Sequence, residues 1–155
     1  MNKATNNMFT QGLLAMLVVL ISAGSALAQQ SLFFSEFIEG GGNNKAFEIY
    51  NPTAEAVDLG NYIVLGNYNG NPFNDTLRFP MGTMLESMDV YVVAHADANA
   101  AITDVADSLV QNPYGGGSSF IAVFNGDDAR ALVHINGTDS MVVDIIGDPS
   151  QDPGA

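Results

Sequence analysis

The feature that most constrains this fold is a series of short β-type segments separated by turn residues. Most segments are rich in aromatic and β-branched residues, which favour strands. Glycine, asparagine and proline lie between them and favour turns. Seven or eight short strands with such turns are typical of a β-sandwich. The expected strands are residues 32–38, 45–51, 57–68, 76–79, 90–94, 120–124, 129–135 and 141–146.

Alternation within these segments predicts which side chains are buried. In the second segment, Phe47 and Ile49 share one face. Glu48 and Tyr50 share the opposite face. Residues 90–94 are apolar at nearly every position, which is typical of a central strand. The last three segments are joined by turns containing Asn-Gly, a strong hairpin signal, so we expect them to form a β-meander.

One short helix is expected between the fifth and sixth strands. Apolar residues recur there at helical spacing, and Asp97 precedes them as an N-cap. We expect this helix to end before Asn112-Pro113, since proline cannot continue it. The periodic residues are Ala98, Ala101, Ile102, Val105 and Leu109.

Residues 1–28 are predicted to be a secretory signal peptide. Lys3 precedes an apolar run at 13–21, which is shorter than the roughly 20 residues of a membrane-spanning helix. Ala26-Leu27-Ala28 matches the small-residue pattern of a cleavage site. An uncleaved membrane anchor is the alternative. We expect residues 29–155 to form one domain that is secreted or held in the cell envelope, in the periplasm or at the cell surface, without stable membrane insertion.

Charge and cysteine content limit the classes of partner and site. Cleavage removes Lys3 and leaves three basic and 17 acidic residues, a net charge of −14. Such a surface repels polyanions, so we expect no direct binding of nucleic acid. The chain has no cysteine, which excludes disulfides, thiol nucleophiles and thiolate metal sites.

Neither histidine lies in a pattern that predicts hydrolytic catalysis. His95 ends one expected strand and His134 lies inside another, as ordinary edge or surface histidines do. Ser118 and Ser119 follow glycines, but no G-x-S-x-G elbow exists to activate them. We therefore predict no catalytic residues and no enzymatic activity for this domain.

Two carboxylates, Glu36 and Glu48, are expected to face each other across the first hairpin. Glycosidases use such pairs, but they also need an aromatic sugar cleft, and the chain has no tryptophan. We expect a structural role instead, in which Glu48 pairs with Lys45 or Arg130.

A candidate metal site lies in the turn before the strand at 129–135. Asn125, Asp127 and Asp128 offer the oxygen ligands that Ca²⁺ prefers. The alternative is that these side chains bond to their own backbone and hold the turn. We predict no other cofactor.

Five blocks of the sequence together form a pattern that covers nearly all of the chain after residue 28. The blocks are Phe34-Ser35-Glu36-Phe37-Ile38-Glu39-Gly40, Asn44-Lys45-Ala46-Phe47-Glu48-Ile49-Tyr50-Asn51, Val57-Asp58-Leu59 with Tyr62, Phe124-Asn125-Gly126-Asp127-Asp128-Ala129 and Val143-Asp144-Ile145-Ile146-Gly147. In sequence and in order these blocks resemble the lamin-tail domains of bacterial exported proteins.

The resemblance implies an all-β, immunoglobulin-like β-sandwich of about seven to eight strands with one short helix. Members of the family usually continue past residues 152–154 into a further strand. We therefore expect that the chain is a fragment truncated at its C-terminus, or that its open edge needs a partner strand.

The resemblance also implies a function, because the family contains binding modules of nuclear lamins and accessory domains beside exported nucleases or phosphatases. We expect a non-catalytic binding or spacer module of an exported protein. It would present loops and an open sheet edge to a protein partner or to a neighbouring domain of a larger chain. The alternative is an accessory-domain fragment of a larger secreted nuclease or phosphatase.

Overall fold

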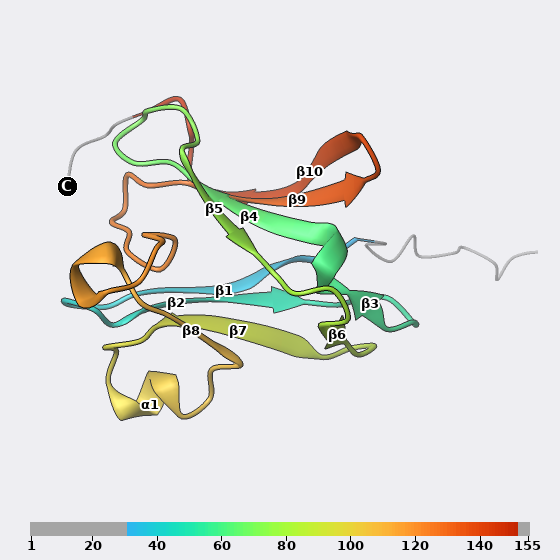
Figure 1. Ribbon diagram of the computed structural model, residues 1–155, viewed down its shortest axis with the longest axis horizontal. Coiled ribbons are helices and arrows are strands. Elements are labelled where there is room, and N and C mark those ends of the chain that lie inside the picture. Colours follow the sequence, from blue (N-terminus) through green and yellow to red (C-terminus); the bar gives the residue numbers. More distant parts are fainter. Residues whose placement is uncertain (1–30, 152–155) are drawn as a thin grey trace, which may run out of the picture.

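The computed structural model describes residues 31–151, which form a sandwich of two four-stranded sheets (Figure 1). The predicted signal peptide and residues 152–155 lie outside the described residues. The first sheet has the order β1-β2-β7-β8 and contains β1 (Phe33–Glu39), β2 (Lys45–Tyr50), β7 (Val90–His95) and β8 (Ser108–Val110). The second has the order β10-β9-β4-β5 and contains β4 (Tyr62–Gly66), β5 (Asp75–Arg78), β9 (Arg130–Asn136) and β10 (Asp139–Ile146).

Smaller elements lie in the connections between these strands. A two-stranded sheet pairs β3 (Val57–Asp58) with β6 (Met84–Leu85). The helical segments are η1 (Leu59–Asn61), α1 (Ala100–Thr103) and η2 (Pro113–Gly115). The predicted immunoglobulin-like β-sandwich with one short helix is thereby confirmed, with ten strands in the described part of the chain instead of seven or eight.

The core lies between the two sheets and follows the predicted alternation. Phe47 and Ile49 point inward from β2, whereas the neighbouring Glu48 and Tyr50 remain partly exposed. The rings of Phe34 and Phe47 meet edge to face at 5.6 Å. Burial of each large apolar side chain contributes roughly 1.5–3 kcal/mol. The main cluster consists of Leu32, Phe34, Phe47, Ile49, Leu59, Tyr62, Val64, Phe79, Leu85, Val93, Ile121, Ala122, Phe124 and Leu132.

The predicted helix is much shorter than the sequence indicates. It spans only Ala100–Thr103, and its N-cap is Asn99 instead of Asp97. Its expected last turn forms β8, which runs parallel to β7. Asp107 explains this difference, because its backbone N–H donates to the carbonyl of Val92 (2.9 Å) and its carboxylate accepts from the Val92 N–H (2.8 Å). This attachment to β7 overrides a weak helical preference.

Residues 120–124 do not form the predicted strand, so the expected meander is reduced to the β9–β10 hairpin. The cause is Arg130, whose side chain is fully buried. Its Nε donates to the carbonyl of Ile121 (2.9 Å) and its Nη2 to that of Val123 (2.9 Å). The carbonyls of this segment therefore bind a guanidinium instead of a neighbouring strand.

The other side of the Arg130 guanidinium also meets backbone carbonyls and aromatic rings. Nη1 donates to the carbonyls of Asn67 (3.1 Å) and Ala129 (2.8 Å). The guanidinium lies 4.9 Å from the centroid of the Tyr68 ring and 5.2 Å from that of Phe124. Burial lowers the pKa of Arg130, and this effect is partly opposed by the charges of nearby acidic groups.

The edge strands β1 and β10 meet at one side of the sandwich. The backbone N–H of Phe34 donates to the carboxylate of Asp144 (2.7 Å), which ties the two sheets together. Each strand is irregular near this contact, with a register shift between Phe34 and Glu36 in β1 and another between Val142 and Asp144 in β10. Such bulges twist an edge and reduce its ability to pair further.

Candidate functional site

The two histidines lie at the predicted places in their strands, and each has contacts that stabilise the fold. His95 is buried, and its Nδ1 accepts from the backbone N–H of Asp97 (3.0 Å) while Nε2 lies 2.9 Å from the Nδ2 of Asn112. His134 packs against the ring of Tyr62, with centroids 4.7 Å apart. The hydroxyl of Ser119 donates to Asp75 instead. Within residues 31–151, neither histidine bonds to a serine hydroxyl, so a nucleophile–base pair is not assembled there.

The turn with the candidate Ca²⁺ ligands is held by Asp128. One carboxylate oxygen accepts from the backbone N–H of Asn125 (2.9 Å), and the other accepts from that of Asn69 (3.1 Å). Asp128 therefore joins the turn to the loop after β4, as the alternative structural interpretation requires. This arrangement leaves Asp127 as the carboxylate most available for a cation.

Asp127 is only 6% exposed, and its Oδ1 has no hydrogen-bond partner among the described residues. A buried acceptor without a partner is uncommon and costs free energy unless water or an ion satisfies it. Across residues 31–151, however, no three His, Asp or Glu side chains gather in a group that could hold a metal ion. The Ca²⁺ site at Asn125, Asp127 and Asp128 stays a prediction.

The predicted partners of Glu48 are wrong. Lys45 lies 3.9 Å from the carboxylate of Glu39, and Arg130 binds the carbonyls described above. Glu48 instead accepts from the hydroxyl of Ser35 (2.6 Å). Glu48 pairs with neither Lys45 nor Arg130, because these two side chains point to the core side of their strands, whereas Glu48 lies on the outer face of its sheet.

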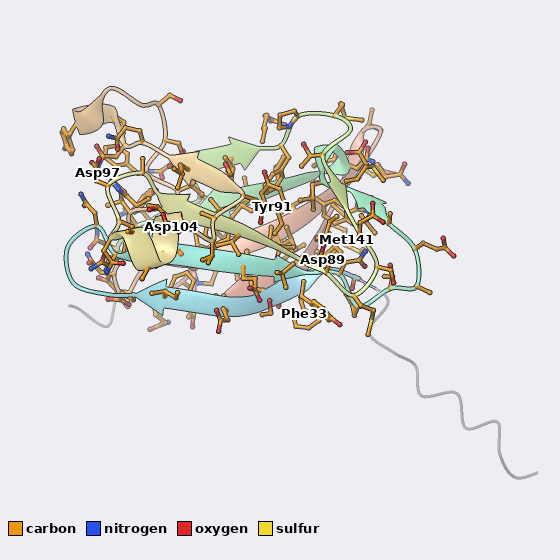
Figure 2. All side chains as sticks on the ribbon, turned by 90° about the horizontal axis from the view of Figure 1, so that it is seen from below. Phe33, Asp89, Tyr91, Asp97, Asp104 and Met141 are labelled. Atoms are coloured by element: carbon orange, nitrogen blue, oxygen red, sulfur yellow. The ribbon has the colours of Figure 1, made fainter. Side chains whose placement is uncertain are left out.

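The outer face of the first sheet carries a groove beside α1, which we call the α1 groove. Figure 2 shows α1 at one end of this face and Phe33 of β1 near the other end. The groove has a volume of about 150 Å³. Its walls include the apolar side chains of Ile38, Val92, Ile102 and Val105.

Two carboxylates line the same groove. Glu36 and Glu48 are direct partners in the β1–β2 register, so both side chains project from one face, as predicted. Val92 is the next partner of Glu48 across the sheet, on β7. The α1 groove thus combines an apolar floor with a pair of acidic groups.

A second exposed feature is the first half of β10, residues 139–142. Within the described residues β10 pairs only with β9, which makes it an edge strand. Met141 is 60% exposed and Val142 is 54% exposed. These residues precede the register shift of β10 and pair regularly with β9. An edge of this kind can accept an added strand.

The sequence did not predict the α1 groove or the buried Arg130. The groove depends on where α1 ends and β8 begins, and helical periodicity placed that boundary wrongly. Arg130 does share the alternation of Leu132, a core residue two positions later, and this pattern is a signal that it points inward. Among the described helices, none has the length and apolar character required to cross a membrane.

A comparison with protein families gives one match. The family model described as Lamin Tail Domain matches residues 25–148. This range includes both sheets, the α1 groove and all of β10. No curated protein shows significant sequence similarity to this chain.

Proposed function

Because the chain belongs to the lamin tail domain family, we propose that it is a binding or spacer module of an exported protein, which contacts a protein partner or a neighbouring domain. The family fold is a non-enzymatic domain type. The observation that supports binding is the edge of β10, where Met141 and Val142 are exposed beside an unpaired backbone edge in the described structure.

Strand addition is the physical route by which this edge would bind. A partner strand would satisfy the outward-facing backbone groups of residues 139–142, and its side chains would cover Met141 and Val142. The bulge before Asp144 and the contact of Asp144 with Phe34 restrict such pairing to the first half of β10.

The experiment that tests this proposal is partner capture from the extracellular and envelope fractions of the source cells. Lysine at an edge strand discourages further pairing, so the M141K/V142K variant should retain much less of the partner. The matched control is M81K/M84K, which adds the same charge at two other exposed methionines. If no protein is retained, or if both variants retain it as well as the unmodified chain, the proposed edge contact is wrong.

A second proposal is that this domain is an accessory part of a larger secreted nuclease or phosphatase. It is supported by the match to the Lamin Tail Domain family, whose immunoglobulin-like fold is consistent with a non-catalytic module. Sequencing the source DNA past codon 155 tests it. An open frame leading into a metal-binding hydrolase domain would support the proposal, and a stop codon at that position would contradict it.

A further inference from the structure

We propose that the α1 groove binds a basic and partly apolar peptide segment of a partner. A Lys or Arg side chain of this segment would lie between Glu36 and Glu48, and an apolar neighbour would fill the space beside Ile102 and Val105. This proposal gives the partner a chemistry and rests on the binding role proposed above. It concerns a different sheet from the β10 edge, so each surface can be tested while the other is intact.

The carboxylate pair is the first observation. Like charges placed directly opposite each other on neighbouring strands destabilise a sheet. Glu36 and Glu48 occupy such positions, and the hydroxyl of Ser35 supplies only a neutral donor to Glu48. A cation between them would remove the repulsion and form charge-assisted hydrogen bonds.

The described residues do not supply that cation. Lys45 lies beside Glu39 and over the ring of Phe124, on the opposite face of the sheet. Arg130 is buried between the sheets, where it binds carbonyls. Arg78 lies on β5 in the second sheet. Among residues 31–151 no other Lys or Arg exists, so charge complementarity requires a cation from a partner.

The apolar walls are the second observation. Val105 is 66% exposed, although it lies beside the groove together with Ile38, another exposed apolar residue. A volume of about 150 Å³ is that of an engineered cavity which accommodates benzene, so the groove has room for one apolar side chain. An apolar side chain of the partner would cover this surface and remove it from water, which favours binding.

These two observations distinguish a basic peptide from other occupants. A polyanion is repelled by the net charge of the chain. Ca²⁺ prefers six to eight oxygen ligands, whereas the groove offers two carboxylates among apolar side chains. A second copy of the described domain offers only Arg78 as an exposed cation, and Arg78 is followed by the buried Phe79. A partner segment in which Lys or Arg alternates with apolar residues can bind the acidic pair and also pack against the apolar side chains of the groove.

The test uses the purified chain and a labelled synthetic peptide in which arginine and leucine alternate. Binding is followed by fluorescence anisotropy at about 0.15 M salt, where diffuse surface attraction is screened within about 8 Å. The E36Q/E48Q variant removes the acidic pair, and the glutamine amide introduced on β2 can still accept from the hydroxyl of Ser35. The matched control is E55Q/E86Q, which removes two exposed acidic groups elsewhere.

We expect E36Q/E48Q to weaken peptide binding at least about tenfold, because hydrogen bonds to a carboxylate are stronger than those to a neutral amide. The control should change binding less than about twofold, because screened distant charges contribute little. A peptide with serine in place of leucine should also bind more weakly. Circular dichroism melting of each variant confirms that it is folded.

Two results would overturn the proposal. One is the absence of peptide binding at millimolar concentration, and the other is an equal loss in E36Q/E48Q and E55Q/E86Q. Either result leaves the capture experiment on β10 unaffected, so failure of the groove is distinguishable from failure of the binding role. Conversely, peptide binding that depends on Glu36 and Glu48 would support the groove even if the β10 edge proves inactive.

Discussion

Replacement of Arg130 by methionine is expected to destabilise the domain more than most single substitutions. Methionine fills part of the same space but cannot donate to the carbonyls of Asn67, Ile121 and Val123. The carbonyl of Ala129 keeps a second donor, the backbone N–H of Asn67. Two buried acceptors and one partly buried acceptor, the carbonyl of Val123, therefore lose their partner.

An unsatisfied buried acceptor costs about 1–3 kcal/mol, so the three carbonyls give at most about 3–9 kcal/mol, with the partly buried one at the low end. Relaxation of residues 120–124 and entry of water favour the lower half of this range, and we expect a loss of about 4 kcal/mol. Domains of this size are stable by about 5–15 kcal/mol, so R130M should be close to the limit of folding. R130K should lose less but still substantially, since an ammonium group cannot reproduce the planar fork of donors.

Urea unfolding monitored by circular dichroism measures this effect. With a slope of about 2 kcal/mol per M, the midpoint should fall by about 2 M. The matched control is R78M, which removes an exposed arginine from β5 and should change stability by less than about 0.5 kcal/mol. A loss below about 1 kcal/mol in R130M would show that the carbonyls find other donors, and the assigned role of Arg130 would be wrong.

Three further predictions concern other parts of the chain. Burial raises the pKa of Tyr68 well above its ordinary value of 10.0, so the free energy of unfolding should fall as the pH rises above about 10. Y68F should reduce the dependence of this free energy on pH by up to one proton, or about 1.4 kcal/mol per pH unit. Identical pH dependence of the two proteins in urea unfolding at alkaline pH would refute this. If Asn125, Asp127 and Asp128 bind Ca²⁺, a Ca²⁺ concentration about ten times the Kd should stabilise the chain by about 1.4 kcal/mol and raise its Tm. D127N should abolish this rise in Tm. An unchanged Tm of the original chain at millimolar Ca²⁺ would exclude the site. Signal cleavage should give an exported protein whose N-terminal sequence starts at Gln29, whereas an intact Met1 in the envelope fraction would indicate an uncleaved anchor.

The sequence predicts the sandwich because its strands carry strong local signals. Alternation at Phe47 and Ile49 identifies the core face of β2, and the apolar run of β7 identifies an interior strand. The turn at Gly137, with a φ of 63°, makes the last hairpin as expected. In these places the local preference and the tertiary packing agree.

The sequence-based predictions of secondary structure are wrong where a side-chain contact with another segment determines the backbone conformation. The sequence of residues 120–124 predicts a strand, but carbonyls of this segment accept hydrogen bonds from the guanidinium of Arg130. Gly66 permits this arrangement, because a Cβ at that position would lie 3.3 Å from the Cζ of Arg130. Leu109 reads as part of a helix, but Asp107 attaches its segment to β7. Sequence periodicity contains no information about these long-range contacts.

The candidate sites also contain some features that the sequence predicts and others that depend on contacts between distant segments. The pairing of Glu36 with Glu48 follows from strand register and was predicted from the hairpin. The apolar wall that makes this pair part of a groove comes from α1, whose extent depends on contacts with β7. The same limit applies to Asp128, because its bond to the backbone of Asn69 joins residues that are 59 positions apart.

The measurement that tests the binding role most directly is amide hydrogen exchange of the chain with and without its captured partner. We expect slower exchange at residues 139–142 of β10 in the complex, because an added strand protects the outward-facing amides. The M81K/M84K control should show the same protection. A stable complex in which the exchange of β10 is unchanged would contradict strand addition at this edge.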